Sequence, residues 1–237
     1  MASKMRKLER QEVTWLALGL FACVLLMAFV ILAGIVGEGS TTGIDTRILR
    51  SLRSPDDPAR PIGPHWLELM MLDLTAIGGP TVLSLVVLII AGFLFIERRH
   101  RMALGVLVTS FGGMLVTEML KQMFDRPRPS VVPHLREVSS SSFPSGHAMQ
   151  SAIVYLTLGA MLMRIVEGRM AKIYVLAMSV FLSLAVGCSR IYLGVHYPTD
   201  VIGGWIIGFV WALFCWLTAQ WFEARGGLEE ERARPVK

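Results

Sequence analysis

The sequence predicts an all-α, polytopic membrane protein with six transmembrane helices. Of its 237 residues, 54% are hydrophobic and only 17% are charged, whereas roughly a quarter of the residues in soluble domains are charged. The apolar residues gather in six stretches, each close to the roughly 20 residues that a helix needs to cross the hydrocarbon core of a bilayer. Basic residues cluster beside these stretches, as they do next to membrane helices. Composition and pattern therefore indicate the same fold class.

The six stretches are expected to form helices in chain order. They are Val13–Val36, Pro80–Ile96, Met102–Leu120, Ala148–Ile165, Ile173–Val186 and Val201–Trp221. The second has room to begin as early as Leu67, and we expect the fifth to continue to about Ile191. The first is longer than the roughly 7–15 apolar residues of a signal peptide, so we interpret it as a spanning helix. We treat residues 1–237 as a single membrane-embedded domain, with residues 1–12 and 223–237 as cytoplasmic tails.

The basic residues predict how the chain is oriented. Six crossings place both termini on one side, where fourteen of the 23 lysines and arginines lie in the tails and in the connections after the second and fourth helices. The positive-inside rule assigns this side to the cytoplasm, so we expect a protein of the cell inner membrane with its long loops on the extracytoplasmic face. Lipid headgroups account for the net charge of +5. The chain has no nucleic-acid-binding motif, and we expect no nucleic-acid partner.

Two loops on the predicted extracytoplasmic face are long. Gly37–Trp66 contains four prolines and a segment, Ile44–Leu52, that we expect to form a short interfacial helix. Phe124–Phe143 contains a cluster of proline and arginine followed by the serine run Ser139–Ser142. Long loops of unusual composition often carry function, so we expect the site on this face.

Three polar clusters lie at the predicted helix ends on the same face. The first is Lys121–Pro129, the second Pro144–His147 and the third Ser189–Asp200. Each has an ordinary structural explanation by itself, such as a lysine that extends to the headgroups, a serine that caps a helix, or an aspartate at the positive end of a helix dipole. Helical hairpins return the chain to the same depth, so all three can meet. Their joint occurrence predicts a single site.

These clusters resemble the signatures of the type 2 phosphatidic acid phosphatase superfamily, which includes bacterial lipid phosphatases and vanadium haloperoxidases. The signatures are Lys-x6-Arg-Pro, Pro-Ser-Gly-His and Ser-Arg-x5-His-x3-Asp. All three occur complete and in order, and the specific resemblance covers only Lys121 to Asp200. The resemblance implies that His196 forms a phosphohistidine intermediate, which water then hydrolyses.

The residue types support phosphate binding independently. A phosphate dianion needs fixed positive charge and hydrogen-bond donors where charge builds up in the transition state. Lys121, Arg128 and Arg190 supply charge, and arginines can bind two oxygens at once. Ser145 and the amides near Gly146 lie at a predicted helix N-terminus, which favours anions.

The remaining residues of the clusters predict catalysis. Asp200 follows His196 by four residues, so its carboxylate can hold one imidazole nitrogen and leave the other free to attack phosphorus. His147 is then the expected general acid. Arg126 is a secondary candidate because it lies outside the strict signature. Glu118, inside an apolar helix, is expected either to pair with the lysine three residues later, to line the pocket, or simply to extend to the interface.

The predicted function is that of a membrane lipid phosphatase acting on a phosphate monoester or diphosphate lipid. Phosphatidic acid, phosphatidylglycerophosphate and undecaprenyl diphosphate all fit, and the sequence does not separate them. We expect no metal and no cofactor, because three cations beside the site would repel a metal ion. One alternative is a lipid phosphotransferase with the same nucleophile. Another is a non-enzymatic anion transporter, which the position of the polar residues at helix ends, away from the bilayer midplane, disfavours.

Overall fold

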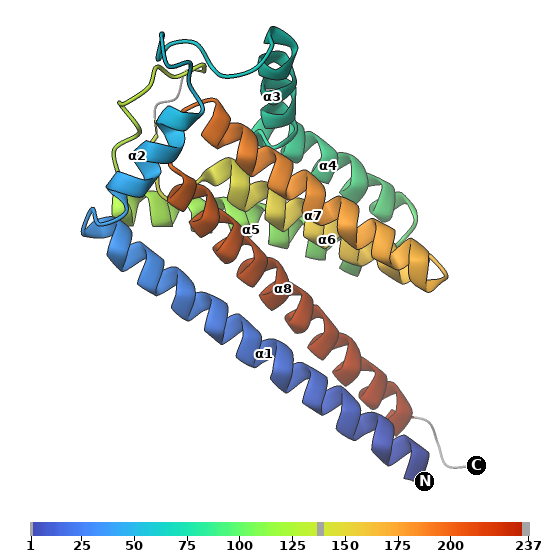
Figure 1. The fold of residues 1–237 in the computed structure, drawn as a ribbon. Helices are drawn as coiled ribbons and strands as arrows, with labels where there is room; N and C mark the ends of the chain where they lie inside the picture. The colour runs from blue at the N-terminus through green and yellow to red at the C-terminus, as the bar shows by residue number, and fades with distance from the viewer. Residues whose placement is uncertain (1, 137–139, 234–237) are drawn as a thin grey trace.

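The structure, a computed structural model, consists of helices and connecting loops. It describes residues 2–136 and 140–233, with side chains for residues 13–222 outside that gap. Within the described residues there are eight helices and no strand, which confirms the all-α class (Figure 1). The helices are α1 (Ala2–Gly37), α2 (Thr42–Ser51), α3 (His65–Ile77), α4 (Pro80–Ile96), α5 (His100–Phe124), α6 (Gly146–Ile165), α7 (Arg169–Tyr192) and α8 (Pro198–Ala233). The short helix expected near Ile44–Leu52 is α2.

The chain is a multi-pass membrane protein. Five of the described helices are long and apolar enough to cross a bilayer, namely α1 from Val13 onward and α5 to α8, the last of these as far as Phe222. Helices α3 and α4 make a sixth span only as a pair bent by 48°. The predicted second span is therefore not one straight helix. It breaks at Gly79 because Pro80, the first residue of α4, has no backbone N–H to continue α3.

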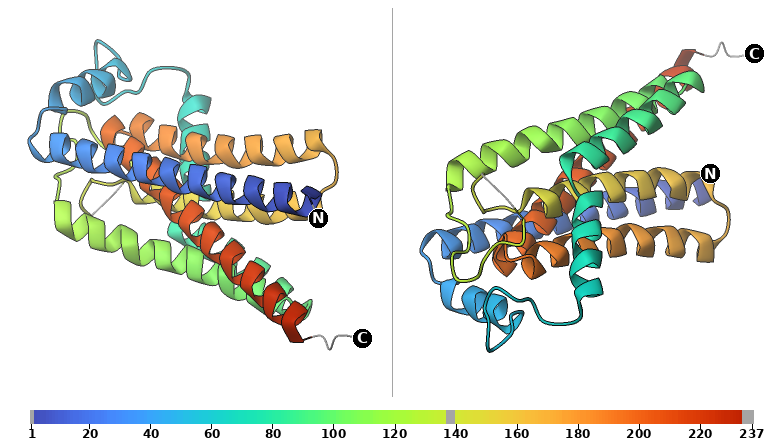
Figure 2. Two further views of the ribbon diagram at one scale, coloured as in Figure 1. Left: turned by 90° about the horizontal axis from the view of Figure 1, so that it is seen from below. Right: turned by 90° about the horizontal axis from the view of Figure 1, so that it is seen from above.

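Helix α6 lies at the centre of the bundle and packs most extensively against α7 and α8. Helix α1 runs along α8, α4 lies against α5, and α3 contacts α7 (Figures 1 and 2). The start of α1 and the end of α8 lie toward one end of the bundle, whereas α2 and the long loops lie at the other (Figures 1 and 2). The long loops and the start of α6 and of α8 thus share one end of the molecule.

Two glycines let α8 approach the backbone of α6. A Cβ added to Gly204 would lie 2.7 Å from the carbonyl oxygen of Ser145, and one added to Gly208 would lie 2.7 Å from that of Met149. Small residues permit this close contact between membrane helices, where packing replaces the hydrophobic effect. The contact places the first turn of α8 directly beside the first turn of α6.

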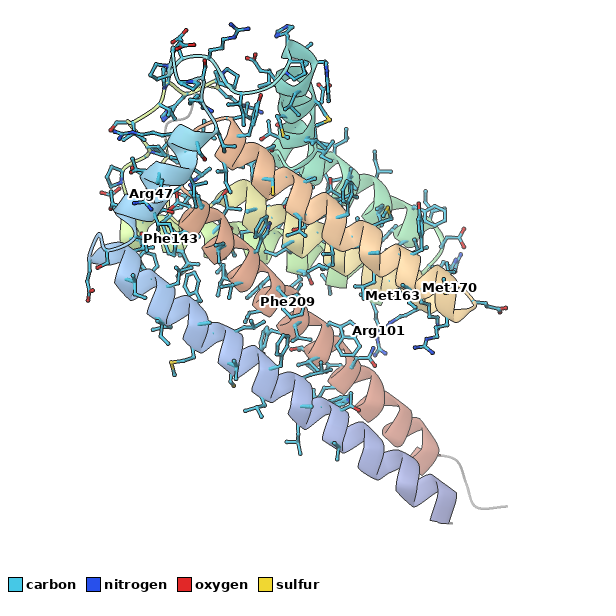
Figure 3. All side chains as sticks on the ribbon, viewed as in Figure 1. Arg47, Arg101, Phe143, Met163, Met170 and Phe209 are labelled. Atoms are coloured by element: carbon cyan, nitrogen blue, oxygen red, sulfur yellow. The ribbon has the colours of Figure 1, made fainter. Side chains whose placement is uncertain are left out.

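Phe143 anchors the loop between α5 and α6. Its side chain is fully buried, stacks on Phe29 of α1 with ring centroids 5.8 Å apart, and meets Phe124 of α5 edge-on at 5.1 Å. Figure 3 shows Phe143 near the start of α8, below the α2 residue Arg47. Aromatic pairs in these geometries stabilise beyond their buried area, so the end of the loop is held in the core. The serines just before Phe143 are consequently held over the helix ends.

Candidate active site

The ends of α5, α6, α7 and α8 meet at the end of the bundle that carries the long loops. The backbone N–H of Ser145 donates to the carbonyl of Asp200 at 2.9 Å, which joins the second motif to the third. A Cβ on Gly146 would lie 3.4 Å from Cε of Lys121, which places the first motif beside the second. The structure thus brings the three motifs together.

Lys121 points into the protein from the last turn of α5. It is 8% exposed, and its ammonium group donates to Ser140 Oγ at 3.1 Å and to the carbonyl of Ser141 at 2.6 Å. This side chain therefore does not extend to the lipid headgroups. Glu118 is exposed and accepts a hydrogen bond from Gln122 at 3.4 Å, so it neither pairs with Lys121 nor lines the site.

Arg128 connects the loop to His196. Its Nε donates to the carbonyl of Ser140 at 2.6 Å, and its Nη1 donates to the carbonyl of Val195 at 2.7 Å. The same Nη1 lies 3.2 Å from Nε2 of His196. Because a guanidinium can only donate, Nε2 is the acceptor and the imidazole proton is on Nδ1. Ser139, part of the predicted serine run, lies outside the described residues.

His196 and Asp200 form the pair that their spacing predicts, but not on one continuous helix. His196 precedes α8, and Asp200 lies in its first turn, with 3.5 Å between Nδ1 and Oδ2. Asp200 Oδ2 also accepts the backbone N–H of Tyr197 at 2.9 Å, a bond that caps the start of α8. The protonated Nδ1 thus faces a carboxylate, and the lone pair of Nε2 faces the guanidinium of Arg128.

Ser142 is a further partner of this pair that the sequence motifs did not single out. It is fully buried, donates to Asp200 Oδ2 at 2.5 Å, and lies 3.4 Å from His196 Nδ1. The sequence signal that pointed to it was its place in the serine run Ser139–Ser142 of a long loop expected to carry function. Ser142 and the imidazole of His196 together restrict the orientation of the Asp200 carboxylate at Oδ2.

Burial keeps His196 neutral. The side chain is 1% exposed, and this burial lowers its pKa from 6.5 to about 3, although Asp200 acts in the opposite direction. Arg128 and Arg190 lower the pKa further because they oppose a second positive charge nearby. The imidazole therefore has an available lone pair at physiological pH.

Three buried polar atoms around the start of α6 have no hydrogen-bond partner within the described residues. They are Oγ of Ser145, Nε2 of His147 and Nε of Arg190. Ser145 is the N-cap residue of α6, yet its side chain makes no capping bond. Buried polar groups are nearly always satisfied, so a set of unsatisfied ones at a helix N-terminus indicates a place for a polar ligand.

Three cations of the site lack a carboxylate partner. Within the described part of the chain, no carboxylate oxygen lies within 4.0 Å of the cationic nitrogens of Lys121, Arg128 or Arg190. Arg190 is 1% exposed, and its Nη1 donates to Thr75 of α3 at 2.8 Å. Buried charges are normally paired, so three unpaired cations around one histidine favour an anionic ligand.

Arg126, the secondary candidate beside the first signature, is paired with carboxylates and is not one of the unpaired cations of the site. Its Nη1 donates to Asp200 Oδ1 at 2.5 Å and its Nη2 to Asp45 Oδ2 at 2.9 Å, so it bridges two buried carboxylates. Asp45 belongs to α2, and sequence reasoning missed it. An acid in the predicted interfacial helix was the only available signal.

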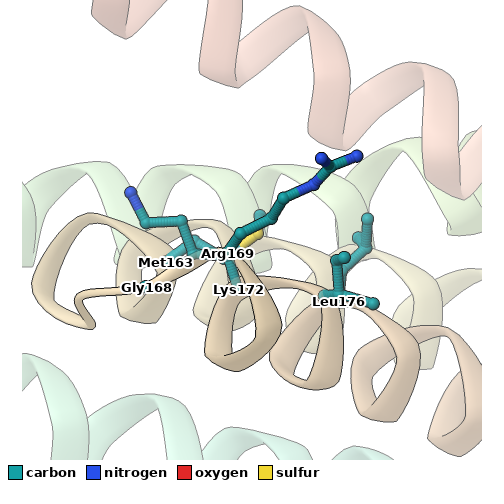
Figure 4. A pocket seen from close by; sticks show the side chains of 6 residues that line it. Met163, Gly168, Arg169, Lys172 and Leu176 are labelled. Carbon is teal, nitrogen blue, oxygen red and sulfur yellow. The ribbon is translucent and has the colours of Figure 1, made fainter.

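A groove at the other end of the bundle lies away from these residues. It has a volume of about 380 Å³ and lies between the end of α6 and the start of α7, at the opposite end of these two helices (Figure 4). It is lined by Met163, Gly168, Arg169, Lys172, Ile173 and Leu176. This lining contains no histidine or carboxylate, so the groove has no group for the predicted chemistry.

Fold and site together define a membrane-embedded enzyme in which cations without carboxylate partners gather at one end of the helix bundle. Residues 102–224 match the family described as the PAP2 superfamily. Phosphatidylglycerophosphatase B of Bacillus subtilis (strain 168) is 31% identical over 192 residues, which cover 78% of this chain and 88% of that protein. The chain therefore belongs to the PAP2 superfamily, and it is a phosphatase.

A further protein and a solved structure are also similar to this chain. Undecaprenyl-diphosphatase BcrC of Bacillus subtilis (strain 168) is 27% identical over 121 residues, 48% of this chain and 55% of that protein. The crystal structure of a transmembrane PAP2 type phosphatidylglycerolphosphate phosphatase from Bacillus subtilis superposes with a TM-score of 0.73 at 27% identity. That superposition covers 91% of this chain and 98% of the other, so the similarity extends beyond the three motifs.

Proposed function

We propose that the chain hydrolyses a lipid phosphate at its extracytoplasmic face through a phosphohistidine intermediate on His196. The observation that carries this proposal is a set of three cations without carboxylate partners around a neutral imidazole, of which Lys121 and Arg190 are buried and Arg128 is half-buried. Together with Arg126 they outnumber the two buried carboxylates of the site, Asp45 and Asp200, by two charges. That excess matches the charge of a phosphate monoester dianion.

The phosphoryl group fits between Arg128 and the start of α6. Arg128 lies beside Nε2 of His196, so a phosphoryl group bound by this arginine would be next to the attacking nitrogen. Lys121, Arg190, the Ser145 hydroxyl and the amides near Gly146 would supply the remaining donors. Donors fixed before the reaction stabilise the transition state without reorganisation, which is how phosphoryl-transfer sites achieve most of their effect.

In the first step, the Nε2 lone pair of His196 attacks phosphorus, and the bond between phosphorus and the lipid oxygen breaks. That oxygen takes a proton from the imidazolium form of His147, which the bound phosphate anion stabilises. Asp200 holds Nδ1–H and offsets the positive charge that forms on His196. In the second step, water attacks phosphorus and gives its proton to His147. The bond between nitrogen and phosphorus then breaks, which releases inorganic phosphate and restores both histidines.

The position of the site supports a lipid substrate. The reacting groups lie at the ends of apolar spanning helices, so a lipid could present its phosphate while its tail stays in the bilayer. The names of the relatives point to phosphatidylglycerophosphate and to undecaprenyl diphosphate as substrates of those proteins. We infer that phosphatidylglycerophosphate is the first substrate to test, because its phosphatase matches the larger share of this chain. The tails and the short basic connections would then face the cytoplasm.

The test is phosphate release by purified protein from phosphatidylglycerophosphate, phosphatidic acid and undecaprenyl diphosphate in detergent micelles. His196→Ala should abolish release, and His100→Ala, which changes an exposed histidine at the start of α5 away from the site, should leave it unchanged. Full activity of the His196 variant would exclude the proposed nucleophile. Release that required a second lipid as acceptor would show a phosphotransferase.

A further inference from the structure

Asp45 is fully buried although it belongs to the short helix α2, outside all three motifs. Its Oδ2 accepts hydrogen bonds from Arg126 Nη2 at 2.9 Å and from Thr199 Oγ1 at 2.6 Å. Its Oδ1 accepts the backbone N–H of Thr199 at 3.1 Å. Both carboxylate oxygens are therefore engaged by groups that adjoin Asp200.

The bond to the Thr199 amide makes Asp45 a cap for α8. The first backbone amides of a helix have no partner within the helix and are usually satisfied by the N-cap side chain. Tyr197, directly before Pro198 at the start of α8, is not one of the short polar residues that usually cap a helix. Asp45 supplies the acceptor from another helix, and its negative charge lies at the positive end of the α8 dipole.

The bond to Arg126 connects Asp45 with the catalytic carboxylate. The two Nη atoms of Arg126 are divided between the carboxylates, with Nη1 on Asp200 Oδ1 and Nη2 on Asp45 Oδ2. The guanidinium also lies 4.2 Å from the centre of the Tyr197 ring, which restricts its plane. The carbonyl of Arg126 accepts the backbone N–H of Ser142 at 2.8 Å, so the same residue holds the other partner of Asp200.

This division determines how Asp200 presents itself to His196. Oδ1 of Asp200 is held by Arg126, which leaves Oδ2 to face the imidazole. Without the charge of Asp45, the guanidinium would have Asp200 as its only carboxylate partner. Both Nη atoms would then be attracted to Asp200, which would turn the carboxylate and draw negative charge away from His196.

We propose that Asp45 is a positioning residue for the phosphatase reaction. Acting through Arg126 and Thr199, it holds Asp200 in the orientation that directs His196 at phosphorus. This inference rests on the proposed roles of His196 and Asp200. It also gives helix α2 a role in the site, because α2 supplies the second carboxylate that Arg126 binds besides Asp200.

The test is steady-state kinetics of Asp45→Asn with phosphatidylglycerophosphate in micelles. The variant should lose about 10- to 100-fold in kcat, the range found when partners that orient a functional histidine are removed. KM should stay within about threefold, because Lys121, Arg128 and Arg190 are untouched. The control is Asp56→Asn, which neutralises an exposed carboxylate in the connection after α2 and should match the parent protein. A folded Asp45→Asn protein with unchanged kcat would overturn the proposal.

A double-mutant cycle separates positioning from general stability. If Asp45 acts through Asp200, then Asp45→Asn should lower kcat little further in an Asp200→Asn background. Effects that multiply in the double variant would show an independent role and overturn the proposal. Activity retained by His196→Ala would instead refute the proposed nucleophile, whatever the result for Asp45.

A second variant covers the case in which Asp45→Asn does not fold because Arg126 is left with an unbalanced buried charge. Asp45→Asn combined with Arg126→Gln removes both charges and should fold. Low kcat with KM preserved is expected, because Asp200 has lost its bridge to α2. A parental kcat in this double variant would overturn the proposal.

Discussion

The low pKa of His196 predicts that this residue contributes to the destabilisation of the protein by acid. The folded state keeps the imidazole neutral down to a pKa of about 3, whereas the unfolded chain binds a proton with a pKa near 6.5. As pH falls below 6.5, the unfolded state gains a proton that the folded state does not bind, so stability is lost. The loss continues until the pH approaches 3.

The magnitude follows from the difference between the two pKa values. At pH 5, protonation of the unfolded chain lowers the free energy of unfolding by about 2 kcal/mol, since each pH unit below 6.5 contributes about 1.4 kcal/mol. At pH 7 the effect is only a few tenths of a kcal/mol. The figure at pH 5 depends almost wholly on the unfolded-state pKa, because the folded imidazole is nearly all neutral there.

The assay compares the parent protein with His196→Asn, whose amide keeps a donor near Asp200 but does not titrate. Unfolding free energies of both proteins are measured in the same detergent at pH 7 and at pH 5. The parent should lose about 2 kcal/mol more than the variant over this interval. Histidine NMR signals of the parent should also include one that does not titrate between pH 7 and pH 5 and that is missing from the variant. Equal losses, together with a His196 signal that titrates near pH 6.5, would refute the reasoning.

Three other predictions concern the loop, the helix contact and the chemistry. Ser142→Ala should lower kcat by about tenfold with little change in KM, because Asp200 loses a buried hydrogen-bond donor. Steady-state kinetics of the variant and the parent protein measure both constants. Gly204→Ala should lower the free energy of unfolding by about 1–3 kcal/mol, because its Cβ would lie 2.7 Å from the Ser145 carbonyl oxygen. Gly92→Ala, which has no atom within 4 Å of its Cβ, is the matched control and should be neutral or stabilising in the same measurement. Phosphate release should persist in excess chelator and should be inhibited by vanadate, whose five-coordinate form resembles the transition state; strict dependence on added Mg²⁺ would favour a metal mechanism.

The location of the spanning helices was predictable because the bilayer imposes a simple rule on composition. A segment that crosses the hydrocarbon must be apolar over about 20 residues, so hydropathy alone locates it. The rule does not require one straight helix, and it therefore missed the break at Gly79 between α3 and α4. It also missed how far the helices continue beyond the apolar core, as α1 does before Val13 and α8 after Phe222.

The chemistry-bearing residues were predictable where neighbours in sequence act together. His196 and Asp200 are four residues apart and meet at 3.5 Å, and Ser145 lies at the start of a helix, as predicted. The roles assigned to these residues, and to Lys121 and Arg128, stay predictions until variants are measured.

The sequence by itself determined the class of fold, the end of the bundle that holds the polar residues, and which short motifs carry charge and imidazole. Only the tertiary structure decided that Arg126 bridges Asp45 and Asp200, because these residues come from α2, the loop after α5 and the start of α8. Local patterns report contacts that the backbone geometry of one segment imposes. A buried ion bridge depends instead on how remote segments pack, and in this protein that packing decides where the carboxylate of Asp200 points.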